Sequence, residues 1–110
     1  MSTKKFKSLY EKEYEIKFRE RKNIPDMESR FYRFQIIKGN NAFGYDFTIT
    51  DKKVKRYNLN ENEIIIICFC LIGELLNSQI EEYCSVQVGK DDIVEYLKVT
   101  RNIERFDDVS

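Results

Sequence analysis

A length of 110 residues predicts one domain, residues 1–110, which can bury a core without disulfides or a metal. Its apolar content of 42%, with eight Phe and seven Tyr, excludes an intrinsically disordered chain. Basic and acidic residues number 19 each, yet residues 1–59 carry a net charge of +7 and residues 60–110 carry −7, which predicts an interaction through charge.

The first half of the chain predicts β-strands. Residues 1–12 are polar and basic, and we expect a flexible arm or one helical turn there. Apolar and polar residues then alternate over residues 14–20, 30–37 and 42–50, which is the pattern of half-buried strands. We expect a fourth strand over residues 54–58, so that four consecutive strands form an antiparallel meander.

The pattern changes at Asn60, where Asn60 and Glu63 match a helix-capping box. The apolar residues that follow predict a long helix over residues 64–83, with Gly73 at a close backbone approach. The first part is apolar all round, which predicts burial on several sides. Because four consecutive Ile residues are β-branched, a strand over residues 64–71 is the alternative, and helix length with the capping box favours the helix.

The end of the chain predicts a second helix. Residues 84–88 are expected to form a short strand or an extended connector. Asp91 or Asp92 would be the N-cap of a helix that extends to about Phe106, followed by a tail over residues 107–110. The expected fold class is α+β, a two-layer sandwich in which a four-stranded antiparallel meander packs on a long buried helix, with a second, C-terminal helix.

The available side chains argue against catalysis. The chain has no His, so His-dependent nucleophiles and the commonest metal ligand are absent. Three Cys residues without a C-x₂-C pair do not predict a zinc site, and no phosphate-binding glycine motif is present. We therefore expect no catalytic residue, no metal and no cofactor. The weaker alternative is a metal-dependent nuclease that uses carboxylates such as Asp46, Asp91 and Asp92.

The acidic half predicts a surface for a protein partner. If the exposed faces of both helices gather their carboxylates, they form a negative patch that attracts a basic partner. The residues expected in this patch are Glu74, Glu81, Glu82, Asp91, Asp92 and Glu95. The function predicted from this patch is a small non-enzymatic inhibitor, of the phage counter-defence (anti-CRISPR-like) or toxin-immunity type.

The basic half supplies the alternative function, nucleic-acid binding by a basic sheet. Lysines beside aromatic rings bind phosphates and stack on bases in single-strand binders. The residues that would do so here are Arg33, Lys52, Lys53, Lys55, Arg56 and Tyr57. Acidic residues in the same half weaken this hypothesis, because phosphate binding depends on accumulated positive charge.

The expected setting is the cytoplasm of a bacterial cell or of an infected host cell. The basic N-terminus is not followed by an apolar segment, so neither a secretory signal nor a membrane partner is expected. The odd number of Cys residues agrees with a reducing compartment. Halves of opposite charge also predict a homodimer.

Overall fold

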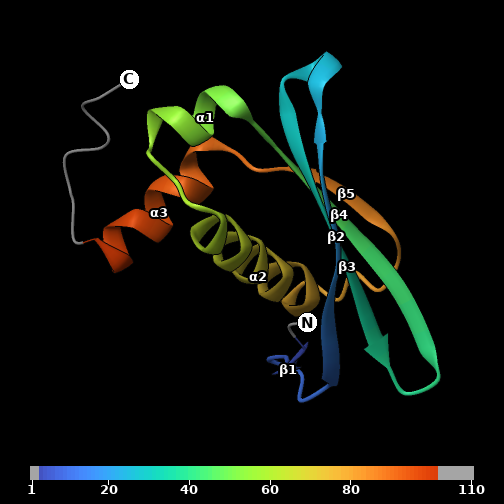
Figure 1. The fold of residues 1–110 in the computed structure, drawn as a ribbon. Coiled ribbons are helices and arrows are strands. Elements are labelled where there is room, and N and C mark those ends of the chain that lie inside the picture. The colour runs from blue at the N-terminus through green and yellow to red at the C-terminus, as the bar shows by residue number, and fades with distance from the viewer. Residues whose placement is uncertain (1–2, 102–110) are drawn as a thin grey trace.

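The computed structural model describes residues 3–101 and shows an α+β fold, in which the helices lie on one face of a five-stranded sheet (Figure 1). The strands stand in the order in which they follow one another in the chain. They are β1 (Thr3–Lys7), β2 (Glu13–Ile24), β3 (Ser29–Lys38), β4 (Asn41–Thr50) and β5 (Cys84–Gln87). The helices are α1 (Asp51–Arg56), α2 (Glu61–Asn77) and α3 (Lys90–Thr100), with a 3₁₀ turn at Pro25–Met27.

The first four strands form an antiparallel meander, as predicted. One of its strands differs from the prediction, because β1 takes the place of the strand expected over residues 54–58. A two-residue turn joins β3 to β4, where Lys38 pairs with Asn41 and Gly39 takes a φ of +58° that favours glycine. β5 adds to β4 in parallel, with Tyr45 opposite Cys84. The parallel pairing follows from the two helices that separate β4 from β5, since a parallel strand needs a crossover connection.

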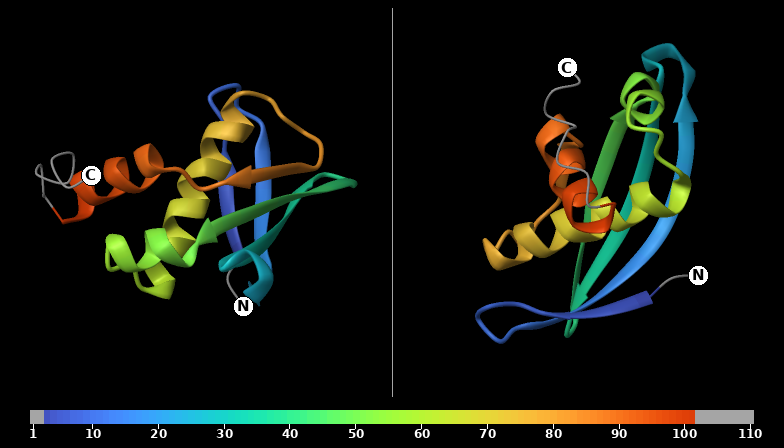
Figure 2. Two further views of the ribbon diagram at one scale, coloured as in Figure 1. Left: turned by 90° about the horizontal axis from the view of Figure 1, so that it is seen from above. Right: turned by 90° about the vertical axis from the view of Figure 1, so that its left-hand side faces the viewer.

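The core lies between the inner face of the sheet and α2. Alternate residues of β3 and β4 point to this face, and Phe34 and Tyr45 are fully buried there. Figure 2 shows α2 crossing that face. The α2 side chains buried against the sheet and α3 are Ile64, Ile67, Cys68, Leu71, Ile72 and Leu76. The strand patterns over residues 30–37 and 42–50 are therefore confirmed, because one face of each strand is buried.

The predicted fourth strand is wrong, because residues 51–56 form helix α1. Thr50 caps this helix, its side chain accepting a hydrogen bond from the Lys53 amide at 3.2 Å. Val54 is the only residue within α1 that is buried. A five-residue segment with two apolar positions is compatible with a strand or a helix turn, and the capping residue favours the helix.

The N-terminal residues form the fourth antiparallel strand instead of an arm or a helical turn. β1 pairs with β2, with Phe6 opposite Tyr14. The Phe6 ring lies against Gly73 of α2, where an added Cβ would come within 3.4 Å of it. The predicted close approach at Gly73 is confirmed, and the ring that makes it explains why a short basic segment is held in the sheet.

Helix α2 confirms the capping box and refutes the strand alternative for residues 64–71. Asn60 accepts from the Glu63 amide at 2.8 Å, and the Glu63 carboxylate accepts from the Asn60 amide at 3.1 Å. The helix ends at Asn77 rather than at Tyr83, because Gln79 adopts a left-handed φ of +59°.

Helix α3 begins two or three residues earlier than its acidic residues suggested. Gly89 is the N-cap, and the Gly89 amide donates to the Asp92 carboxylate at 2.9 Å, so Asp92 stands within the first turn. Residues 102–110, which include the end predicted for this helix and the tail, lie outside the described residues. None of the helices in residues 3–101 has the length and apolar content to cross a membrane.

Candidate functional site: a groove between two helices

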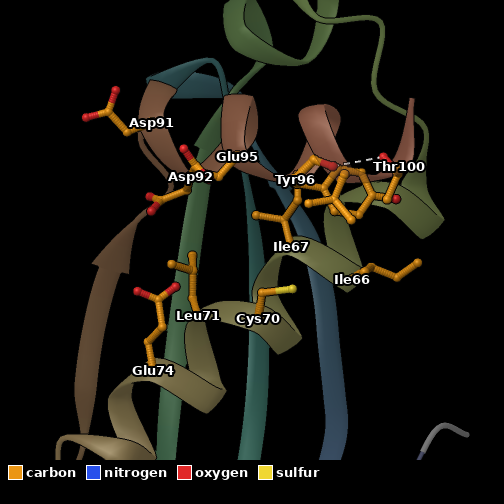
Figure 3. A pocket seen from close by; sticks show the side chains of 11 residues that line it. Ile66, Ile67, Cys70, Leu71, Glu74, Asp91, Asp92, Glu95, Tyr96 and Thr100 are labelled. Atoms are coloured by element: carbon orange, nitrogen blue, oxygen red, sulfur yellow. Dashed lines mark hydrogen bonds between the residues drawn. The ribbon is translucent and has the colours of Figure 1, made fainter. Parts of the chain in front are cut away.

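A groove of about 410 Å³ opens between α2 and α3, on the side of α2 that the sheet leaves uncovered (Figure 3). Both helices contribute side chains to it. The lining residues are Ile66, Ile67, Cys70, Leu71 and Glu74 from α2, and Asp91, Asp92, Glu95, Tyr96, Val99 and Thr100 from α3. The two ends of the groove differ, because the carboxylates lie towards one end and Ile66, Tyr96 and Thr100 towards the other (Figure 3).

The groove exists because α2 has more apolar faces than its neighbours can cover. Ile64 and Ile72 are fully buried, but Ile66 remains 44% exposed and Cys70 is also exposed. From α3, Val99 is 82% exposed. Adjacent exposed apolar side chains in a concave surface are typical of a binding site rather than of a solvated helix face.

Four carboxylates surround the acidic end of the groove, and among residues 3–101 only one of them has a cation partner. Glu74 and Asp91 are exposed and form no ion pair with any residue in the range 3–101. Asp92 accepts only the capping hydrogen bond from Gly89. Glu95 is paired at 4.0 Å with Lys98, one turn further along α3, and this contact is weak. Among residues 3–101, no Lys or Arg lines the groove.

Some acidic residues elsewhere in the fold are neutralised by basic side chains, and Glu61 is the most extensively bonded example. Glu61 binds Arg21 and Arg30, each at 3.0 Å, and accepts from the Tyr32 hydroxyl. Burial alone would raise the pKa of Glu61, but the hydrogen bonds from Arg21 and Tyr32 lower it below its ordinary value. The groove differs from the Glu61 cluster because, among the described residues, only Glu95 of its four carboxylates has an ion pair.

The structure brings together four of the six residues predicted for the acidic patch: Glu74, Asp91, Asp92 and Glu95. Glu81 belongs to another cluster, since it accepts from Tyr14 and from Lys38, the latter at 3.0 Å. Hydrogen bonds from Tyr14 and Lys38 lower the pKa of Glu81. Glu82 is exposed beside it, away from the groove. The end of α2 at Asn77 explains this separation, because it removes both residues from the helix face that carries Glu74.

The residues predicted to bind nucleic acid do not form one surface. Four of them lie on α1 rather than in the sheet: Lys52, Lys53, Lys55 and Arg56. Lys53 donates to the Val88 carbonyl at 3.1 Å, and Tyr57 is only 2% exposed, so its ring is not available to stack on a base. Arg33 lies in β3, where it binds Asp46 at 2.9 Å. The structure therefore divides these residues between α1 and β3.

The carboxylates of the nuclease alternative are also separated. Asp46 is buried in β4, where it binds Arg33 and accepts from the Tyr83 hydroxyl at 2.8 Å. Asp91 and Asp92 lie on α3 in the groove. In residues 3–101, no three Cys, Asp or Glu side chains form a group that could hold a metal ion.

Sequence reasoning missed the apolar part of the groove. Ile66, Cys70, Tyr96 and Val99 line the groove but are not among the residues predicted for a binding site. The available signal was the apolar character of residues 64–72 on all sides, since a helix on one sheet buries fewer faces than that. Comparison with known proteins adds no relative, because no family model, no curated protein and no solved structure matches this chain.

Proposed function

We propose that this chain is a non-enzymatic protein-binding domain that holds a short segment of a partner protein in the α2–α3 groove. The observation that carries the proposal is the combination of exposed apolar side chains with four carboxylates in one concave surface, of which only Glu95 has an ion pair among residues 3–101. The chemistry that complements this surface is a segment with apolar side chains on one side and Lys or Arg at one end.

The two parts of the groove have different physical roles. Burial of Ile66 and Val99 supplies the gain in free energy, at about 25 cal/mol per Å² of apolar surface removed from water. The carboxylates raise the rate of encounter with a basic partner and fix the direction in which the segment lies. Because this attraction is screened by salt, binding should weaken as ionic strength rises.

The length of the groove suits a short helix. From Ile66 to Glu74, α2 advances eight residues, or about 12 Å, which is close to two helical turns. An amphipathic helix can place two or three apolar residues along that distance and its Lys or Arg residues beside Glu74 and Asp91. A domain that covers such a segment would act on its partner as an inhibitor, in the manner of a toxin-immunity or phage counter-defence protein.

The test uses two synthetic peptides and measures their affinity by fluorescence anisotropy. The first carries a Leu-rich face with Lys residues at one end, and the second has Glu in place of each Lys. We expect the Lys peptide to bind at least about tenfold more tightly, with an affinity that falls as salt is added. Equal affinity for the two peptides would contradict the role given to the acidic end.

Two matched charge variants locate the binding site. The variant D91K/E95K reverses charge in the groove and should abolish binding of the Lys peptide. The control variant E28K/E82K makes the same change in charge at two exposed residues outside the groove and should leave binding unchanged. If both variants weaken binding equally, the peptide is responding to net charge and the α2–α3 groove is not the site.

A further inference from the structure

The turn between β1 and β2 holds two large apolar side chains in solvent. Leu9 is 80% exposed and Tyr10 is 59% exposed. Neither side chain is packed against the core cluster. Adjacent exposed residues of this size are unusual unless they contact something outside the chain.

The backbone of this turn is nevertheless firmly held. The Ser8 side chain is buried and accepts hydrogen bonds from the amides of Tyr10 and Lys12, at 3.3 and 3.2 Å. The Ser8 amide also donates to the Lys12 carbonyl at 2.9 Å. The Leu9 amide donates to the Asn77 side chain at 2.9 Å, which fixes the turn to the end of α2. A fixed backbone with outward apolar side chains loses little conformational entropy when it binds.

The charge around this turn is opposite to that of the groove. Residues 3–13 contain four Lys and two Glu, for a net charge of +2. Lys5 and Lys7 are exposed on β1, although each stands opposite a Glu of β2, Glu15 and Glu13 respectively. The groove has the complementary composition, since the described residues that line it include apolar side chains and four carboxylates but no Lys or Arg.

We propose that the β1–β2 turn of one copy places Leu9 and Tyr10 in the α2–α3 groove of a second copy. Lys5 and Lys7 then approach the carboxylates of Asp91 and Glu95. The inference rests on the proposed function, because it names an occupant for the same groove. Within one copy the groove remains open, since neither Leu9 nor Tyr10 lines it and the turn is fixed to Asn77.

Self-association of this kind would regulate the domain. Each copy has one turn and one groove, so a reciprocal dimer fills both grooves, whereas a one-way contact leaves one free for a further copy. In either arrangement a partner segment must displace the turn before it binds. The apparent affinity for the partner should therefore fall as the concentration of the domain increases.

The test measures molar mass by light scattering after gel filtration, with the full chain at low salt and high micromolar concentration. We expect the wild type to exceed the monomer mass of 13.3 kDa and to return to it as salt is raised. The turn variant L9S/Y10S and the groove variant D91K/E95K should each be monomeric. The control M27S removes an exposed apolar side chain from the β2–β3 turn and should still associate.

The decisive result comes from mixing L9S/Y10S with D91K/E95K, neither of which should associate on its own. The turn variant keeps an intact groove and the groove variant keeps an intact turn, so a mixture should recover a one-to-one complex. A wild type that remains monomeric, or a mixture that shows no complex, would overturn the inference. If the Lys peptide still binds in that case, the proposed function stands and only the self-association fails.

A lipid surface is the other surface that a Lys-flanked Leu-Tyr turn suits. The second copy is favoured because a groove of matching shape and charge is present in the same chain. Flotation with phosphatidylserine vesicles separates the two. Vesicle binding by a monomeric wild type that is lost in L9S/Y10S would assign the turn to membranes and overturn the inference.

Discussion

Arg101 joins the end of α3 to the beginning of α2, with its Nε atom 3.0 Å from Oε2 of Glu63. The same guanidinium donates to the carbonyls of Tyr57 and Asn58, at 3.1 and 3.0 Å. The Glu63 side chain is already part of the α2 capping box with Asn60. These contacts fix the separation of the two helices that form the groove.

The variant R101A should therefore lose both stability and groove binding. Because it removes several hydrogen bonds to a partly buried carboxylate, we expect the free energy of unfolding to fall by about 2 kcal/mol. Urea denaturation measures this change. Affinity for the Lys peptide should fall as well, since the helices are no longer held at one separation. The exposed Arg19 forms no ion pair with a described residue, so R19A should change neither quantity.

Because of the Tyr32 hydroxyl, we expect the free energy of unfolding to depend on pH in the alkaline range. Burial, together with its hydrogen bond to Glu61, raises the pKa of Tyr32 to about 12, whereas an unfolded tyrosine has a pKa of about 10. A raised folded pKa contributes stability that is complete below pH 10 and is lost as pH rises towards 12. We therefore expect Tyr32→Phe to cost about 1 kcal/mol at pH 8.

The same variant should become nearly as stable as the wild type at high pH. Between pH 9 and pH 11, the wild type should lose about 1 kcal/mol more than Tyr32→Phe, because only the wild type ionises this residue on unfolding. Urea denaturation at the two pH values gives the difference. A constant gap between the two proteins would show that the Tyr32 proton is not linked to folding.

Because the Asp46 carboxylate is buried, removal of its partner Arg33 alone should lower the free energy of unfolding more than removal of both charges. Burial would raise its pKa, but hydrogen bonds from Arg33 and Tyr83 lower it below its ordinary value. Arg33→Ala leaves the buried Asp46 carboxylate with one partner and should lower the free energy of unfolding. Adding Asp46→Asn to that variant should recover part of the loss, because the buried charge is removed.

The control for this pair lies on the same face of the sheet. Lys17 and Glu15 form an ion pair at 3.6 Å in which both side chains are about one third exposed. Lys17→Ala should therefore cost less than about 0.5 kcal/mol in the same urea experiment. A larger loss from Lys17 than from Arg33 would contradict the importance given to Asp46.

The three thiols should differ in their reaction with Ellman's reagent. Cys68 is buried and Cys84 is half-buried, while Cys70 is exposed in the groove. We expect Cys70 to react first, but more slowly than free cysteine, because burial and the nearby Glu74 raise its pKa. The Lys peptide should protect Cys70 further. Protection that persists in D91K/E95K would show that the peptide covers Cys70 without the acidic end, which contradicts the role given to Asp91 and Glu95.

The sequence by itself determined the local elements. Alternation over residues 30–37 and 42–50 predicted β3 and β4, and the spacing of Asn60 and Glu63 predicted the start of α2. These features depend on residues close together in the chain, where side-chain periodicity and capping act directly. The division of charge between the halves was also visible without the structure.

Only the tertiary structure decided which faces were covered. Whether Thr3–Lys7 is an arm or a strand depends on Phe6 reaching Gly73, and that contact joins distant parts of the chain. The groove likewise arises from the angle at which α3 meets α2, which leaves Ile66 and Val99 without neighbours. The physical reason is that a side chain is buried by contact between two elements, whereas the sequence pattern describes one element at a time.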